Sequence, residues 1–338
     1  MTAQHELSCE WPDGRLPQCS GAPPPVSLAF VDERLREDNV PGDRIALVGP
    51  GAIGSTVAAL LHAAGHPITL CGRTARESIE VRPDDKDPIV VPGPVLTDPA
   101  EITEPADIVL LAVKDTQNED AGAWLARLCD GDTIVCALQN GVEQVERVGR
   151  FCPSSTVVPA AIWISAEPDP GGWIRLRTGV RLVLPAEPDK RAAERLARLF
   201  GDADVSVELD PDFTSAAWRK LLVNAVVGLM VLTGRRMGMF RRDDVVSLAR
   251  RYLQECLAVA RADGATLGDE VIDETMNLFS QVPADITTSM LTDREAHRPL
   301  EWDIRNGVIR RKAAQYGLAT PISDVLVPLL AAASDGPG

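Results

Sequence analysis

Short apolar runs alternate with stretches of helical spacing between about residues 44 and 209. A continuous apolar run between two helices is typical of a strand in a parallel sheet whose two faces are both covered. This part of the chain is therefore predicted to be an α/β domain. The expected strands are 44–49, 68–72, 107–113 and 133–138, with strand character again at 156–165, 173–184 and 205–209, and the expected helices are 55–65, 118–129, one from near 142, and 189–200.

The pattern changes after Val207, where every later segment has helical spacing. Asp210 is a plausible N-cap and Pro211 a plausible first helical residue, so a second, all-α domain is expected to begin there. The Pro-rich segment before the first strand predicts a flexible extension, to which we assign no chemistry. The predicted division is 1–42 extension, 43–209 α/β domain and 210–332 helical domain.

Composition narrows the range of partners. The 338 residues hold 34 Lys and Arg against 49 Asp and Glu, a net charge of −15, which argues against nucleic acid and anionic membranes as main partners. The seven cysteines form no CxxC pair, and the chain starts without a basic and apolar leader, so a reducing, cytoplasmic location is expected. The longest apolar stretch, 221–232, is broken by Asn224 and is too short to span a bilayer.

Three glycines follow the first expected strand with the spacing G-x-G-x-x-G. Gly49 permits a tight turn, Gly51 lets a pyrophosphate approach the backbone, and Gly54 lets the next helix pack closely. The motif is weak alone, but it lies here between a strand and a helix, as dinucleotide binding requires. A structural glycine turn is the alternative. The predicted pyrophosphate loop is Gly49, Pro50, Gly51, Ala52, Ile53 and Gly54.

Further polar residues follow later strands. Arg73, with Arg76 three residues later, ends the second strand, where NAD-specific sites usually carry an acid. An arginine there would meet a 2′-phosphate, so NADPH is favoured over NADH. A solvated surface arginine is the alternative. Lys114 and Asn140 follow the next two apolar strands. Because ligands bind at the carboxyl edge of such sheets, we expect both near the cofactor, although each alone could be a turn residue.

Lys220 and Asn224 lie one turn apart on an otherwise apolar helix. A buried lysine has a lowered pKa and suits an acid that releases its proton near neutral pH. A lysine whose stem packs while its head reaches water is the alternative. Ser289 lies one turn before Asp293, and Glu301 lies at a helix start, where it could simply complement the helix dipole.

In this order, the segments GPGAIG, AVKDTQ, LQNG, WRKLLVN, SMLTDREAHRPLE and NGVIRRKAAQYGLATP resemble the ketopantoate reductase (2-dehydropantoate 2-reductase) family over about residues 44–330. The resemblance implies a Rossmann domain followed by a helical domain of the 6-phosphogluconate dehydrogenase C-terminal type. It implies NADPH-dependent reduction of a small-molecule 2-oxo acid, ketopantoate, to pantoate.

The resemblance also implies roles for single residues. Gly49 to Gly54 would take the pyrophosphate and Arg73 the 2′-phosphate, with Lys114 and Asn140 near the ribose and nicotinamide. Lys220 would be the proton donor, and Asn224 and Ser289 would hold the substrate. Glu301 would contact cofactor or substrate hydroxyls and help to set the lysine.

The chain departs from the family at two positions that usually carry asparagine, now Gly228 and Gly238. Losing two amides would vacate space and remove polar anchors, which weakens the choice of substrate more than the type of reaction. A same-fold reductase of a different ketone or imine is therefore an alternative, and a non-catalytic NADPH sensor or scaffold is another. The apolar face near residues 246–260 fits a homodimer through the helical domain, and a core face explains it equally well.

Overall fold

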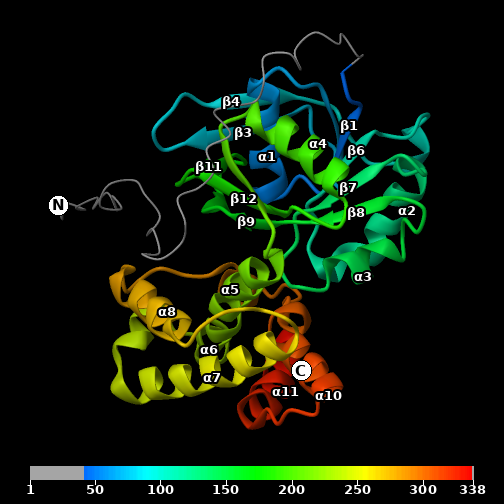
Figure 1. The fold of residues 1–338 in the computed structure, drawn as a ribbon. Helices are drawn as coiled ribbons and strands as arrows, with labels where there is room; N and C mark the ends of the chain where they lie inside the picture. Colours follow the sequence, from blue (N-terminus) through cyan, green and yellow to red (C-terminus); the bar gives the residue numbers. More distant parts are fainter. Residues whose placement is uncertain (1–41, 337–338) are drawn as a thin grey trace, which may run out of the picture. The chain divides into compact units, whose positions relative to one another are not determined.

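The computed structural model describes residues 42–336 of the chain. The flexible extension expected at residues 1–42, with Cys9 and Cys19, lies outside these residues apart from Gly42. The described residues begin with strands and alternating helices and end with helices alone (Figure 1).

A six-stranded parallel sheet forms the centre of the first part. Strand β1 (Ile45–Val48) is buried along its whole length and pairs with β2 (Ile68–Cys71) and β6 (Ile108–Leu111). Ile45 lies between Ile68 and Ile108. The strand order reverses on the two sides of β1, and dinucleotides bind in the crevice that such a reversal leaves at the carboxyl ends of the strands. The other strands are β2 (Ile68–Cys71), β5 (Val95–Leu96), β6 (Ile108–Leu111), β7 (Ile134–Ala137) and β8 (Thr156–Pro159), in the spatial order β5-β2-β1-β6-β7-β8.

Helices cover both faces of this sheet, as continuous apolar strands require. Helix α1 (Ala52–Ala63) packs with α4 (Lys190–Gly201) in one core, and α2 (Asn118–Leu128) packs in the core on the other face. Helix α3 (Gln144–Gly149) begins two residues later than expected, and α1 begins three residues earlier, directly after Gly51. The Rossmann-type α/β prediction is confirmed.

Two smaller sheets complete the first part. One has the order β10-β11-β3-β4, and its hairpin of β3 and β4 was not expected from the sequence. The other has the order β13-β12-β9 and joins the strand-like segments that the sequence did predict. Their strands are β3 (Ser78–Pro83), β4 (Ile89–Pro92), β9 (Ala161–Trp163), β10 (Ala166–Pro168), β11 (Ile174–Leu176), β12 (Val180–Pro185) and β13 (Val205–Asp210).

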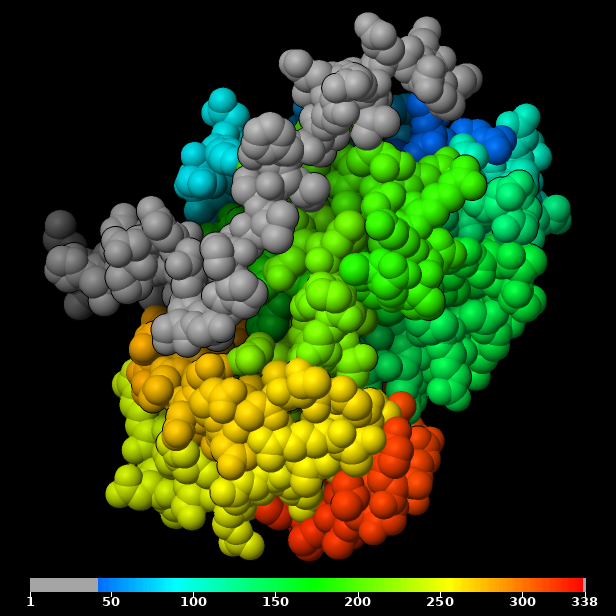
Figure 2. Space-filling model, in the orientation of Figure 1, coloured from blue at the N-terminus to red at the C-terminus, as the bar shows by residue number. Residues whose placement is uncertain are grey.

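The second part is helical and has its own buried core, which contains Trp218, Tyr252 and Phe279. In Figure 2, α10 (Val308–Tyr316) and α11 (Pro321–Ser334), both red, lie at its surface. Its helices are α5 (Phe213–Val226), α6 (Gly228–Thr233), α7 (Asp243–Ala262), α8 (Glu270–Gln281), α9 (Ser289–Glu295), α10 (Val308–Tyr316) and α11 (Pro321–Ser334).

The expected start of the first helix of this part is wrong by two residues. Asp210 is the last residue of β13, and Pro211 lies in the turn. The N-cap of α5 is Asp212, whose carboxylate accepts a hydrogen bond from the backbone N–H of Ser215 at 3.2 Å. Asp210 instead accepts from the backbone N–H of Asp212 at 2.8 Å, so both acids serve the turn but only the second caps the helix.

Helices α5 and α6 form one apolar stretch, Phe213–Thr233, that is longer than the sequence suggested. By length and composition it could cross a membrane, but 61% of its most apolar window is buried inside the protein. Most of its apolar side chains, including Trp218 and Met230, belong to the core of the helical part, whereas Lys220 and Asn224 are only half-buried. The stretch is therefore the central helix of this core.

Candidate active site

The three glycines of the turn between β1 and α1 differ in what a side chain at each position would contact. Gly49 has a φ of +95°, and a Cβ there would lie 2.6 Å from Cγ1 of Val113. A Cβ at Gly54 would lie 2.2 Å from the carbonyl oxygen of Gly49, so this glycine lets the helix pack against the turn. A Cβ at Gly51 would meet nothing within 4 Å. No contact among the described residues explains a glycine at 51, whereas the approach of a ligand to the backbone does.

The other cofactor candidates follow three neighbouring strands of the same sheet. Arg73 comes after β2 and is exposed, and it makes no hydrogen bond or ion pair with any described residue. Lys114 follows β6, and Asn140 follows β7. Parallel strands place these three positions at one edge of the sheet, where the glycine turn also lies.

Asn140 connects this edge to the helical part. Its Oδ1 accepts a hydrogen bond from Nζ of Lys220 at 3.1 Å and one from Nδ2 of Asn224 at 3.4 Å. Its Nδ2 donates to Oε2 of Glu301 at 3.2 Å. The structure thus brings together four of the predicted residues, from a loop of the sheet, from α5 and from the segment before α10.

Lys220 is half-buried, and the pKa of its side-chain amine is unusually low for a lysine. Burial is the main cause, repulsion by Arg305 adds to it, and attraction by Glu301 opposes it, so that the pKa of Lys220 falls to about 7. An amine with this pKa can donate and accept a proton near neutral pH. The location of its head group against Asn140, and not in bulk water, favours the functional interpretation over a solvent-directed lysine.

Glu301 is buried and stays ionised. Burial alone would raise the pKa of its carboxyl, but the charges of Arg305 and Lys114, together with hydrogen bonds from Arg305 and Asn140, outweigh it and hold the pKa below its usual value. Glu301 lies directly before the helical turn that begins at Trp302. Its contacts with Asn140 and Arg305 show that it does more than complement a helix dipole.

Arg305 is a site residue that the sequence analysis missed. Its Nη2 donates to Oε2 of Glu301 at 2.8 Å and to Oγ of Ser289 at 3.0 Å, and its side chain is only 4% exposed. The spacing of four residues from Glu301 was the available signal, because such residues are neighbours on a helix. Arg305 lies in a π-helical turn, Asp303–Gly307, and such turns occur frequently at functional sites.

Ser289 and Lys114 border this cluster. Ser289 is exposed at the start of α9 and reaches the cluster through Arg305. Lys114 forms an ion pair with the buried carboxylate of Asp293, which Arg298 also approaches at 3.4 Å. All the predicted catalytic and substrate-binding residues are therefore connected by short contacts, whereas the exposed Arg73 stands apart from them.

The prediction that Gly228 and Gly238 leave vacated space is wrong. A Cβ at Gly228 would lie 3.0 Å from Nδ2 of Asn306, a buried amide that donates to the carbonyl oxygen of Ala225 and to the hydroxyl of Tyr252. A Cβ at Gly238 would lie 2.9 Å from Cβ of Ala284. Neighbouring side chains therefore fill the room that an asparagine would need at these two positions.

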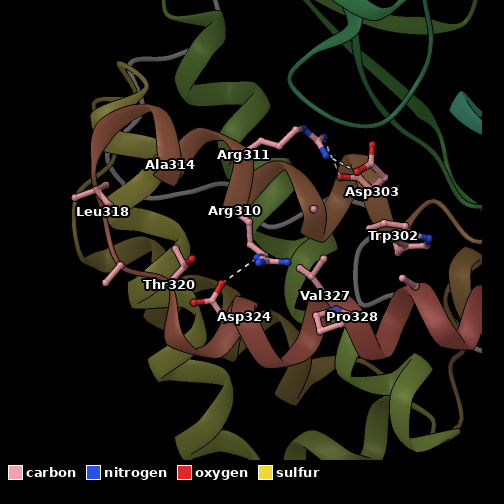
Figure 3. Close-up of a pocket in the computed structure, with 13 residues that line it drawn as sticks. Trp302, Asp303, Arg310, Arg311, Ala314, Leu318, Thr320, Asp324, Val327 and Pro328 are labelled. Atoms are coloured by element: carbon pink, nitrogen blue, oxygen red, sulfur yellow. Dashed lines mark hydrogen bonds and ion pairs between the residues drawn. The ribbon is translucent and has the colours of Figure 1, made fainter.

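A second charged cluster lies beside the site and joins the loop after β7 to the helical part. Arg311 donates to Glu143 at 2.7 Å, Arg147 donates to Asp115 at 2.9 Å, and Asp303 pairs with both arginines. Figure 3 shows Arg311 turned toward Asp303, at the rim of a groove of about 600 Å³ between α10 and α11. The groove is lined by none of the predicted catalytic or cofactor-binding residues.

Comparison with known proteins agrees with this geometry. The family model described as "Ketopantoate reductase PanE/ApbA" matches residues 45–188, and the model for the C-terminal part of the same family matches residues 212–334. A 2-dehydropantoate 2-reductase from Mycobacterium tuberculosis is 65% identical over 294 residues, which cover 87% of this chain and 99% of the relative. One from Caulobacter vibrioides is 34% identical and covers 86% and 99%.

Solved structures share the fold. The dimeric ketopantoate reductase of Staphylococcus aureus superimposes with a TM-score of 0.78 at 26% identity, covering 87% of this chain and 100% of that one. The two family models match the sheet part and the helical part in turn. The long relatives and the Staphylococcus aureus structure cover both parts together. The chain belongs to the ketopantoate reductase family.

Proposed function

We propose that this protein is an NADPH-dependent 2-dehydropantoate 2-reductase, which reduces the 2-oxo group of 2-dehydropantoate to the alcohol of pantoate in the synthesis of pantothenate and coenzyme A. The observation that carries the proposal is the position of Lys220. Its ammonium, with a pKa of about 7, touches Asn140 at the carboxyl edge of a dinucleotide-binding type of sheet. The identity of 65% to a 2-dehydropantoate 2-reductase supports the choice of substrate.

The cofactor would lie along the sheet edge. In this proposal residues 43–209 hold NADPH and residues 210–332 supply the substrate pocket and the proton donor. The turn from Gly49 to Gly54 fits a pyrophosphate because position 51 leaves its backbone open. Arg73 is free to meet the 2′-phosphate, and Lys114, Asn140 and Glu301 lie where the ribose and the nicotinamide would be contacted.

When bound, NADPH supplies a hydride for the carbonyl carbon of the substrate. Lys220 stabilises the negative charge that grows on the carbonyl oxygen and then gives that oxygen its proton. The hydrogen bond to Asn140 and the charge of Glu301 hold the ammonium in place. Asn224 and Ser289 orient the substrate from the helical part.

The alternative functions have less support. The alternative of a different ketone or imine rested on vacated space at Gly228 and Gly238, and those positions are packed by Asn306 and Ala284. The alternative of a sensor or scaffold explains neither the lowered pKa of Lys220 nor its contact with Asn140. The panel of substrates described below distinguishes both alternatives from 2-dehydropantoate reduction.

We also propose that the protein forms a homodimer through its helical part. The apolar face near residues 246–260 is not available, because Ala249, Leu253 and Leu257 on α7 are buried in the core. Helix α11 instead exposes Val325 (60%) and Leu329 (51%), one turn apart. The dimeric relative from Staphylococcus aureus supports a dimeric state. The cytoplasmic location stays a prediction.

The proposal is tested by turnover of a panel of 2-oxo acids, ketones and imines by the full chain, with NADPH and NADH side by side. We expect 2-dehydropantoate with NADPH to give the highest kcat/KM and pantoate as product. A higher kcat/KM for another ketone or imine would show that the protein is a same-fold reductase of that compound instead. Tight NADPH binding without turnover of any compound would select the sensor.

A further inference from the structure

None of the residues given a role in the proposed function supplies a positive charge for the carboxylate of the substrate. The inference that follows rests on that proposed function. A 2-oxo acid carries one carboxylate beside its carbonyl, and planar bidentate recognition of a carboxylate favours arginine. The usual amides at positions 228 and 238 are glycines here, so two polar anchors are missing. Another group must therefore hold this end of the substrate.

The other nearby cations already have partners or tasks. Lys114 is paired with Asp293, which also faces Arg298. Lys220 faces the carbonyl oxygen as its proton donor in the proposed reaction. Arg305 is the cation that remains beside Ser289 and Glu301 among the described residues of the cluster.

Arg305 has hydrogen-bonding capacity to spare. A guanidinium carries five N–H groups, and the two bonds to Glu301 and Ser289 both come from Nη2. Its Nε is buried without a hydrogen-bond partner, and within residues 42–336 Nη1 donates to no side chain or carbonyl. Leaving charged N–H groups unpaired beside a buried site is costly, and a bound carboxylate would remove that cost.

The position suits the chemistry of the proposed reaction. Arg305 and Asn140 both donate to Oε2 of Glu301, and Asn140 in turn accepts from Nζ of Lys220. Two short links through Glu301 and Asn140 therefore connect the two cations. We propose that Arg305 binds the carboxylate of the 2-oxo acid together with Ser289, and that it determines the preference of this enzyme for acids over neutral carbonyl compounds. Glu301 accepts a hydrogen bond from Nη2 of Arg305 and fixes the orientation of the guanidinium, while Nε and Nη1 stay available.

The test compares 2-dehydropantoate with its neutral carboxamide, which keeps the 2-oxo group and the hydroxyl but lacks the charge. For Arg305→Gln we expect kcat/KM for the acid to fall by about 10- to 100-fold, mostly through KM, because one charge-assisted contact is lost. The carboxamide should lose much less, so that the preference for the acid collapses. Equal losses for both compounds, or an unchanged KM for the acid, would overturn the assignment.

Two further variants keep the result interpretable. Arg305→Lys retains the positive charge beside Glu301 and should give a preference for the acid over the carboxamide between those of the wild type and Arg305→Gln. It keeps the test valid if Arg305→Gln does not fold. Arg310→Gln is the matched control, because Arg310 lies on α10, pairs with the exposed Asp324 at 2.9 Å and faces the groove of Figure 3. Its kinetics should match the wild type; a collapse of acid preference there would contradict the proposal.

A crystal structure of the wild-type protein with NADPH and pantoate provides a test that needs no variant. The carboxylate should lie within hydrogen-bonding distance of Arg305 and of Oγ of Ser289, and a carboxylate bound by Lys114 instead would overturn the inference. Turnover of 2-dehydropantoate by the wild type remains the separate test of the proposed function. If the wild type is active and the ratio of acid to carboxamide is unchanged in both Arg305 variants, only this inference fails.

Discussion

At the scale of single residues, the lowered pKa of Lys220 predicts how the reaction rate depends on pH. In the proposed mechanism reduction needs the protonated amine, and burial with repulsion by Arg305 lowers the pKa of this amine to about 7. We therefore expect kcat/KM for the 2-oxo acid to be level below pH 7 and to fall by about tenfold for each pH unit above it. Oxidation of the alcohol should show the opposite trend, since it needs the neutral amine.

Initial rates measured over a pH series with saturating NADPH check this prediction. An ordinary lysine would stay protonated until about pH 10. A kcat/KM that stays level up to about pH 9 would show that the amine is not perturbed as described.

The residue scale also shows what the sequence could and could not predict. Lys220 and Asn224 were recognisable because polar residues one turn apart are conspicuous on an apolar helix. Arg305 was missed because its burial against Glu301 depends on tertiary packing. The expected space at Gly228 was wrong for the same reason: the sequence does not reveal that the Asn306 amide lies 3.0 Å from a Cβ placed there.

At the scale of elements, the glycine turn makes a separable prediction. Gly51→Val places its side chain in open space, so the protein should keep its melting temperature while its NADPH affinity falls by at least about tenfold, since the side chain blocks the pyrophosphate. Gly54→Val instead collides with the carbonyl of Gly49 and should lower the melting temperature itself.

Thermal unfolding and cofactor titration of the two variants check the pair. NADPH affinity retained in Gly51→Val, with a normal melting temperature, would remove the pyrophosphate from this turn. The matched substitution at Gly54 provides the control for loss of packing.

Element prediction succeeded where pattern alone determines structure. Strands β1, β6 and β7 were predicted because they are continuous apolar runs between helices. The hairpin of β3 and β4 was not, because its short strands mix polar and apolar residues around charged turns. The start of α5 was misplaced because Asp210 and Asp212 are both acceptable caps, and only the folded turn decides between them.

At the scale of the whole molecule, the proposed chemistry depends on contacts between the sheet part and the helical part. Asn140 meets Lys220 and Glu301, and Arg311 meets Glu143 beside them. Spacing in the sequence could place each residue on its element but could not show these pairings, which join positions from 80 to 168 residues apart. The family resemblance, and not periodicity, supplied this level of the prediction.

The proposed dimer makes a prediction at this scale. Leu329→Asp puts a charge in the exposed apolar face of α11 and should convert the wild-type dimer to a monomer, as measured by sedimentation equilibrium. Val90→Asp is the control, because Val90 is 53% exposed on β4, outside that face. A monomeric wild type, or a dimer that survives Leu329→Asp, would contradict this assembly.

The central claim is that Lys220 delivers the proton in an NADPH-dependent reduction. The most direct measurement is kcat for 2-dehydropantoate in wild type and Lys220→Ala, with NADPH affinity determined for both. The account predicts a fall in kcat of about 10²- to 10⁴-fold, with NADPH affinity nearly unchanged. A variant that turns over at the wild-type rate would contradict it.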